Sequence, residues 1–383
     1  MSETIERVGL THIQIPLKEP FRISGGEVAI KDAILVTIES SGGLGLGESS
    51  PMASSFGYSS DTPEGCWDDL VGQIVPSLLG RSVASVEDIA SLVAGWDASS
   101  RFAVAGAETA LHDLLAQSRH TSIAGLLGVS AEQASLGIES GLAVGLYPTV
   151  VELLRTIETH LVEGYRRVKI KICPGSDLEL VRAVRQHFGE LPLMVDANAA
   201  YRLDAETMET FRALDDFDLL MIEQPLAARD IAGLTRLQAS LVTPICIDET
   251  ADTLAMTVEA IEQEACRIVN LKLQRVGGYG PAKAIHDYCA SKGIACWVGT
   301  MPELGVGQAH GIHLASLGNC RYPTDIEPSS RWFVDDFTVP RLELHSPGYL
   351  RVPDRSGLGF VLDMMKVKRY QVRHVDYAKQ VSS

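Results

Sequence analysis

Five charged residues recur through the middle of the chain, each at the end of a short apolar run. They follow one another at intervals of 25, 27, 25 and 24 residues, and they are Lys171, Asp196, Glu223, Asp248 and Lys272. One strand, one helix and their loops need roughly that length, so the period indicates consecutive βα units of a parallel barrel. Catalytic residues of such barrels lie at the carboxyl ends of the strands. The spacing therefore predicts an active site built from these five side chains.

The three acids of this series predict a metal site. Asp196, Glu223 and Asp248 would end three neighbouring strands and point into one mouth, where carboxylates repel one another unless a cation lies between them. Oxygen ligands without histidine or cysteine favour Mg²⁺, and Mn²⁺ can substitute for it. Any one of these acids alone would more often be a helix cap or a surface residue. Three acids at matching strand ends favour the metal site.

The two lysines predict proton transfer. Lys171 and Lys272 fall on the expected second and sixth strands, which lie on opposite sides of an eight-stranded mouth. A substrate carboxylate at the metal would present its α-carbon with one lysine on each face. A divalent cation would stabilise the enediolate that forms when the α-proton leaves. Lys169 and Arg275 would add positive charge nearby, although a surface position suits these two residues equally well.

The composition is that of a globular enzyme. The chain has 383 residues, of which 46% are hydrophobic and 21% charged, and this length allows a barrel and a second domain. A formal net charge of −16 argues against nucleic acid and anionic membranes as partners. The N-terminus has no signal-peptide pattern, and no apolar run reaches the length of a membrane span. Seven cysteines without CxxC spacing indicate reduced thiols, so we expect a cytoplasmic protein.

Residues 1–125 are predicted to form a separate α+β domain, because strand patterns come first and helical periods follow. The expected strands span 8–15 and 33–39, and the expected helices span 67–79, 86–94 and 102–118. The glycines at 42–47 predict a hairpin turn that runs into the next strand. Two small, polar segments, 21–26 and 49–60, are either surface loops or a lid that closes over the barrel mouth and excludes water. Their apolar residues are Phe21, Met52, Phe56 and Tyr58.

Residues 126–326 are expected to form the barrel, and 327–383 a C-terminal segment that packs back on the first domain. The expected barrel strands span 136–146, 167–172, 193–195, 219–222, 245–247, 268–271, 295–298 and 321–326. The expected helices span 149–163, 177–188, 204–214, 230–240, 253–262, 280–291 and 304–317, and most begin near Asp, Thr or Pro, as helices commonly do. The basic tail from Lys366 onwards is most simply a solvated terminus.

Several longer motifs surround the charged residues. They are Val168-Lys169-Ile170-Lys171-Ile172, Val195-Asp196-Ala197-Asn198, Ile222-Glu223-Gln224-Pro225, Ile247-Asp248-Glu249-Thr250, Asn270-Leu271-Lys272 with Arg275-Val276-Gly277-Gly278, Gly299-Thr300-Met301-Pro302-Glu303, and Ser330-Arg331-Trp332-Phe333. Over nearly its whole length the chain resembles the enolase superfamily, and within it the o-succinylbenzoate synthase and N-acylamino acid racemase group. The resemblance implies a (β/α)₇β barrel under an α+β capping domain, Mg²⁺ at the three acids, and Lys171 and Lys272 as the acid/base pair.

The resemblance also implies how substrate is bound. It makes the two N-terminal segments a specificity lid, with Phe21 and Met52 facing a small-molecule carboxylate. The other candidate substrate-binding residues are Asn198, Thr300, Met301 and Phe333. The kinship further suggests a homo-oligomer, either a dimer or an octamer. The chain departs from the group's pattern at Thr300, Pro302 and Leu304, where Gly, an aliphatic residue and Thr, respectively, are usual. This departure leaves the identity of the substrate open.

Members of this group dehydrate the menaquinone precursor SHCHC to o-succinylbenzoate, racemise N-acyl or N-succinyl amino acids, or do both. Both reactions begin with removal of the same α-proton. Dehydration can use one lysine as base, whereas racemisation needs one lysine on each face. Arg275 stands where racemase-capable members tend to carry an arginine, which favours racemase activity.

Other functions remain as alternatives. A dipeptide epimerase or a muconate cycloisomerase would share the catalytic residues, but dipeptide enzymes usually carry an Asp-x-Asp pair where this chain has Met301-Pro302-Glu303. A Schiff-base aldolase would use one lysine and no metal, and the three aligned acids argue against it. A barrel that had lost catalysis would be expected to lack a lysine or a ligand, and this chain retains all of them.

Overall fold

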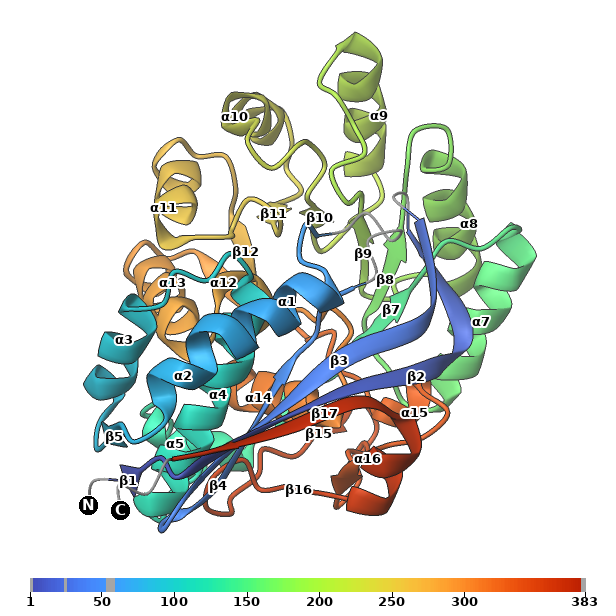
Figure 1. Cartoon of the computed structure of the whole chain (residues 1–383). Coiled ribbons are helices and arrows are strands. Elements are labelled where there is room, and N and C mark those ends of the chain that lie inside the picture. The colour runs from blue at the N-terminus through green and yellow to red at the C-terminus, as the bar shows by residue number, and fades with distance from the viewer. Residues whose placement is uncertain (1–2, 24–25, 53–58, 380–383) are drawn as a thin grey trace.

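The centre of the protein is a curved sheet of parallel strands (Figure 1). The computed structural model describes residues 3–23, 26–52 and 59–379. Within them, seven parallel strands follow the order β13-β12-β11-β10-β9-β8-β7. They are β7 (Leu142–Val144), β8 (Val168–Lys171), β9 (Leu193–Asp196), β10 (Ile222–Glu223), β11 (Ile245–Ile247), β12 (Ile268–Leu271) and β13 (Ala295–Val298). Strand order follows chain order, as repeated βα units require, and this confirms the predicted barrel.

Helices alternate with these strands and cover the outside of the sheet (Figure 1). They are α7 (Val150–Val162), α8 (Leu178–Phe188), α9 (Ala205–Asp215), α10 (Ile231–Ala239), α11 (Leu254–Glu262), α12 (Leu273–Val276), α13 (Tyr279–Ser291) and α14 (Gly305–Ala315). Polar side chains cap several of their N-termini, as the sequence indicated. Thr149 accepts a hydrogen bond from the amide of Glu152, and Asp204 accepts one from Thr207. Each cap fixes the point at which the chain leaves a strand-end loop and enters a helix.

The eighth position of the barrel differs from the prediction. We expected a strand over 321–326, but among the described residues this segment makes only isolated pairs. Cys320 pairs with Cys296 of β13, and Thr324 pairs with Ser140 beside β7. Pro323 has no amide hydrogen to donate, so it interrupts a regular ladder. The segment still closes the barrel, because the amide of Asp325 donates to the carbonyl of Val298 at 3.0 Å.

An antiparallel sheet with the order β17-β2-β3-β4 lies over one end of the barrel (Figure 1). Its strands are β2 (Arg7–Ile23), β3 (Gly26–Ser40), β4 (Gly43–Ser49) and β17 (Gln371–Ala378). The helical segments after it are α1 (Pro63–Asp69), η2 (Leu70–Ile74), α2 (Val75–Leu78), α3 (Val86–Ala94) and α4 (Arg101–Ser118). This arrangement is the predicted α+β cap.

The C-terminal tail was wrongly expected to be a solvated terminus. Its residues form α16 (Met364–Tyr370) and then β17, which pairs with β2 along its length. The pairing joins segments more than 350 residues apart, so no local pattern could reveal it. The remaining short elements are β1 (Glu3–Thr4), β5 (Ser82–Val83), α5 (Ile123–Leu126), α6 (Ala131–Ser135), β6 (Ile138–Glu139), α15 (Ser329–Trp332), β14 (Thr338–Val339), β15 (Tyr349–Leu350) and β16 (Val361–Leu362).

Two further predictions about local structure are corrected. Within the expected loop at 21–26, the described residues belong to the strands β2 and β3, in which Phe21 pairs with Val28 and Ile23 with Gly26. The expected first barrel strand at 136–146 is divided, because β6 pairs with β15 and only β7 joins the barrel. In the other lid segment, Phe56 and Tyr58 lie outside the described residues. Among the described residues, no helix has the length and apolar character needed to cross a membrane.

The glycines expected to make a hairpin turn mostly lie inside β4, against α4. A Cβ on Gly45 would lie 2.1 Å from the carbonyl oxygen of Ala110, and one on Gly47 would lie 1.9 Å from that of Gly106. Real side chains do not approach backbone atoms so closely. Glycine is therefore required because the strand and the helix touch backbone to backbone.

Gly47→Ala is expected to destabilise the protein by about 3 kcal/mol, because both clashing partners are backbone and the helix would have to move. Denaturant-induced unfolding measures this change. Gly72→Ala is the matched control, since a Cβ at Gly72 in η2 meets nothing within 4 Å. Equal stability of the two variants would contradict the close-packing argument.

Candidate active site

The five predicted charged residues meet at the carboxyl ends of the barrel strands. Each lies at the end of β8, β9 or β10, or one residue beyond β11 or β12. All are buried, with Lys171 the most exposed at 8%. Burying so much charge is costly unless opposite charges lie within contact distance.

The buried charges neutralise one another in pairs. Lys171 Nζ lies 2.5 Å from Oδ2 of Asp196, and Lys272 Nζ lies 3.0 Å from Oδ2 of Asp248. Lys169 Nζ lies 3.1 Å from Oε2 of Glu223. Each acid of the series therefore has an ammonium group beside it.

Arg275, predicted to add positive charge, does so at Asp248. Its guanidinium forms an ion pair with Oδ1 of Asp248, whose Oδ2 contacts Lys272. Lys169, two residues before Lys171 on β8, points to the same face of the strand, so it reaches the same charge cluster and lies 3.5 Å from Asp196. The structure thus places both of these residues in the site rather than on the surface.

The pKa shifts show how strongly these groups interact. Burial, together with the charge of Asp196, raises the pKa of Glu223 to about 8. Burial disfavours the charged form of Lys169, but the nearby carboxylates, Asp325 first among them, raise its pKa well above its ordinary value. The raised pKa of Glu223 means that it holds its proton more firmly than an ordinary glutamate, and the raised pKa of Lys169 means that this lysine keeps its charge.

Asp325 is a site residue that the sequence analysis missed. It is 4% exposed, and it forms ion pairs with Lys169 and with Arg167, the latter at 2.9 Å. Burial alone would raise the pKa of Asp325, but Lys169 and Arg167 lower it to about 2. A signal was present, because Asp325 lies one residue before the end of the expected eighth strand (321–326), as Lys171 does in the expected second strand (167–172).

A small cavity of about 40 Å³ lies against this cluster. Its lining residues are Lys169, Lys171, Lys272, Asp325, Phe21, Ile23, Ala143, Thr300, Met301, Pro302 and Trp332. Lys171 and Lys272 come from strands separated by β9, β10 and β11, which end in the three acids. The cavity therefore has one of these two lysines on each side, and the three acids, which do not line it, lie on the strands between them.

The predicted substrate-binding residues divide into two groups. Phe21, Thr300 and Met301 line the cavity. The other three do not line it: Met52 is buried with its Sδ 3.3 Å from Lys31 Nζ, Asn198 donates to Glu249 at 3.3 Å, and Phe333 is buried in the core.

Trp332, the neighbour of Phe333, supplies the aromatic side chain at the cavity. Its ring meets Phe21 edge to face, with centroids 5.0 Å apart. The sequence contained both aromatic residues, but it could not indicate which one faces inward. That choice depends on the short helix α15, which places Trp332 on the cavity and Phe333 against β2.

The donor chemistry of the three acids suits a hard divalent cation, because all three are buried carboxylates with no histidine or cysteine among them. Among residues 3–23, 26–52 and 59–379, no three His, Cys, Asp or Glu side chains are arranged closely enough to hold an ion. The carboxylate oxygens of the three acids instead contact lysines and Arg275. A bound cation would take over the neutralisation that these ammonium and guanidinium groups provide.

Comparison with known proteins agrees with this geometry. The model of the mandelate racemase/muconate lactonizing enzyme N-terminal domain matches residues 6–128, and the enolase C-terminal domain-like model matches 152–367. An o-succinylbenzoate synthase from Geobacillus stearothermophilus is 41% identical over 376 residues, covering 97% of this chain and 96% of the relative. An N-succinylamino acid racemase from Amycolatopsis is 38% identical over 354 residues, covering 92% and 93%.

A comparison with a solved structure supports the same family relationship. An enolase superfamily member from Listeria innocua matches with a TM-score of 0.90 and 35% identity, covering 98% of this chain and 99% of that one. The chain is thus a member of the enolase superfamily, in its mandelate racemase and muconate lactonizing enzyme group. Within that group it belongs to the family of o-succinylbenzoate synthases and N-succinylamino acid racemases, as its motifs indicated.

Asp325→Asn is expected to lower the free energy of unfolding by about 3 kcal/mol or more, because Arg167 and Lys169 remain buried without this counter-charge. Chemical denaturation checks the value. Asp287→Asn serves as control, because its ion pair with Lys283 is surface-exposed and is worth about 0.5 kcal/mol. An equal loss of stability in the two variants would contradict the argument that burial makes the ion pairs of Asp325 more costly to break than an exposed pair.

Proposed function

We propose that this enzyme removes a proton α to a carboxylate and acts as an o-succinylbenzoate synthase, an N-succinylamino acid racemase, or both. The observation that carries this proposal is the placement of Lys171 and Lys272 on opposite sides of one buried cavity. The names of the relatives at 41% and 38% identity support the two reactions.

We further propose that Asp196, Glu223 and Asp248 hold Mg²⁺, for which Mn²⁺ can substitute. When bound, the ion stabilises negative charge on the substrate carboxylate. Binding would release Lys171 and Lys272 from the aspartates that they now contact. Without the ion, the two aspartates thus hold both lysines at the mouth. With the ion bound, both lysines would be available to the substrate.

In racemisation, a neutral lysine accepts the α-proton from one face as the carbon–hydrogen bond breaks. The opposite lysine, protonated, returns a proton to the other face, which inverts the centre. In dehydration, one lysine accepts the α-proton and then gives a proton to the β-hydroxyl, which leaves as water as the carbon–oxygen bond breaks. The second lysine then only stabilises charge, so one arrangement of residues serves both reactions.

The other features of the proposal follow from kinship. We propose a cytoplasmic homo-oligomer, a dimer or an octamer, that acts on a small carboxylate. A dipeptide epimerase or a muconate cycloisomerase remains the alternative, and an L-Ala-D/L-Glu epimerase from Bacillus subtilis is 28% identical over 368 residues. The synthase and racemase relatives are more similar, so we rank their reactions first.

Lys171→Ala and Lys272→Ala are each expected to abolish racemisation, because each removes the proton carrier on one face. ¹H NMR in D₂O with Mg²⁺ and N-succinyl-L-amino acids measures deuterium entry at the α-carbon. Parallel samples with SHCHC measure dehydration. Lys283→Ala, an exposed lysine on α13, is the control and should keep full activity. Full racemase activity in either active-site variant would refute the two-lysine assignment.

A further inference from the structure

Helix α4 of the cap contacts the segment that follows Lys272. This segment, residues 273–280, contains α12 and the first turn of α13. Glu108 of α4 is 1% exposed, and its two carboxylate oxygens bind two consecutive backbone amides of the segment. The amide of Tyr279 donates to Oε2 at 2.9 Å, and the amide of Gly280 donates to Oε1 at 2.8 Å. A buried side chain of the cap therefore holds the segment next to one of the two active-site lysines.

The glycine pair before α13 admits this carboxylate. A Cβ on Gly278 would lie 2.3 Å from Oε2 of Glu108, which is closer than real side chains approach. Gly277 and Gly278 also have φ angles of +94° and +114°, which disfavour residues with a side chain. The first amides of a helix have no partner within the helix and lie at the positive end of its dipole, so they favour a negative group. Glu108 supplies that group from the cap.

His112, one turn further along α4, lies beside the same carboxylate. Its Nδ1 is 3.3 Å from Oε2 of Glu108, and both side chains are buried. Burial disfavours the charged imidazolium, but the negative charge of Glu108 raises the pKa of His112 above its ordinary value. Glu108 thus has a partner on its own helix while both of its oxygens are bonded to the barrel segment.

Two further side chains join the same segment to the cap. Gln274 of α12 donates to the carbonyl of Glu48 at 2.7 Å and accepts from the amide of Ser50 at 3.0 Å. Arg101, at the start of α4, donates to the carbonyl of Arg275 at 3.5 Å. The cap therefore holds this segment at α12 and again at the start of α13.

The residues around Lys171 are held by the barrel instead. The amide of Ile172, directly after Lys171, donates to the carbonyl of Asp196 at 2.9 Å. Within the part of the chain that the structure describes, no hydrogen bond joins α4 to residues 168–178. The two lysines thus differ in which domain fixes the chain beside them.

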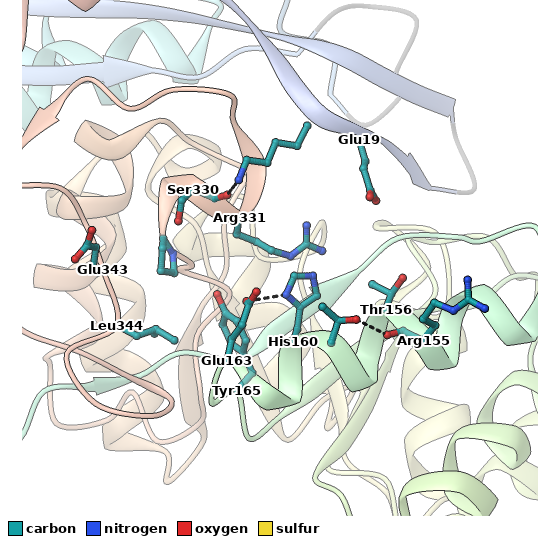
Figure 2. A pocket seen from close by; sticks show the side chains of 13 residues that line it. Glu19, Arg155, Thr156, His160, Glu163, Tyr165, Ser330, Arg331, Glu343 and Leu344 are labelled. Carbon is teal, nitrogen blue, oxygen red and sulfur yellow. Dashed lines mark hydrogen bonds and ion pairs between the residues drawn. The ribbon is translucent and has the colours of Figure 1, made fainter.

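Helix α7, which leads into the strand of Lys171, also lacks such an anchor. A cavity of about 650 Å³ lies between α7 and the cap strand β2. Figure 2 shows Glu19 of β2 on one side of this space, and Arg155 and His160 of α7 on the other. Among the described residues, Glu19 makes no hydrogen bond or ion pair with either of them. The cap therefore does not hold α7 as it holds residues 273–280.

We propose that Glu108 is a positioning residue for proton transfer, which sets the place of Lys272 through residues 273–280 and leaves Lys171 unaffected. The inference rests on the proposed function, because it assumes that each lysine serves one face of the α-carbon. It adds an asymmetry to that function: the barrel alone holds one lysine, whereas the cap and the barrel together hold the other. Loss of the Glu108 carboxylate then impairs proton transfer on one face only.

The test measures the two faces separately in the full-length enzyme. In D₂O with Mg²⁺, ¹H NMR follows deuterium entry at the α-carbon of N-succinyl-L-phenylalanine and N-succinyl-D-phenylalanine, in substrate recovered without inversion. Each enantiomer gives its proton to a different lysine, which can exchange that proton with solvent and return deuterium to the same face. Lys171→Ala and Lys272→Ala identify which enantiomer depends on which lysine.

In Glu108→Gln, racemisation is expected to fall about tenfold, because a misplacement of about 1 Å in a catalytic group can cost on the order of 100-fold. Deuterium entry should fall by a similar factor for the enantiomer that depends on Lys272 and stay close to the wild-type rate for the other. Glu108→Asp keeps the charge and should lose less. It supplies the decisive comparison if Glu108→Gln fails to fold, as judged by thermal unfolding.

Asp113→Asn is the matched control. Asp113 lies on the same helix, is equally buried, and also accepts hydrogen bonds from two backbone amides, those of Leu46 at 2.8 Å and Leu358 at 2.7 Å. Neither amide belongs to residues 273–280, so any loss in this variant should be equal for the two enantiomers. In Glu108→Gln, an equal loss for both enantiomers, a loss confined to the Lys171 enantiomer, or no loss would overturn the proposal.

Failure of the proposed function gives a different result. If the wild type acts on neither the amino acids nor SHCHC, the proposed reaction is wrong. Amide hydrogen exchange measured by mass spectrometry then tests the anchor alone, and it does the same if the wild type acts only on SHCHC. Faster exchange at 273–280 in Glu108→Gln, with unchanged exchange at 168–178, supports the asymmetry. An equal change in both segments, or no change in either, overturns it.

Discussion

The structure depends on the mutual neutralisation of charges buried at the barrel mouth. An isolated buried ion costs several kcal/mol, and here acids and bases share one small volume. The pairs Lys171–Asp196 and Lys272–Asp248 each join neighbouring strand ends, so the cost is met only when the strands are in their correct order. The charge network and the barrel therefore require each other. A bound cation would be consistent with this neutralisation, because it would replace one set of positive charges with another.

The capping sheet is tied to this mouth by a second set of buried polar contacts. The carboxylate of Glu48, at the end of β4, accepts hydrogen bonds from the amides of Leu304 and Gly307, each at 2.7 Å, at the start of α14. Gln274, between Lys272 and Arg275, donates to the carbonyl of Glu48 at 2.7 Å and accepts from the amide of Ser50 at 3.0 Å. The end of β4 is thus held by the short helix α12 (Leu273–Val276), which directly follows Lys272.

Much of this organisation could be predicted from the sequence, because it repeats. The 25-residue period shows the barrel, and the charged residue at each strand end shows the site. Asp325 obeys the same rule, because it lies near the end of the expected eighth strand, but the sequence analysis did not select it; in the structure that strand is reduced to isolated pairs around Pro323. The pairing of β17 with β2 and the inward position of Trp332 rather than Phe333 were not predictable. Both depend on contacts between distant segments, on which local periodicity gives no information.

In the proposed mechanism, both candidate reactions use Lys171 and Lys272, so these residues cannot by themselves select a substrate. Selection must come from the walls that surround the substrate's remaining atoms. On one side these walls are the unusual residues Thr300 and Pro302, and on the other the rings of Phe21 and Trp332. Phe21 comes from the capping sheet and Trp332 from the C-terminal segment, which meet where Leu17 pairs with Phe333. The barrel therefore fixes the chemistry, while the joint between the first and last parts of the chain decides which carboxylate undergoes it.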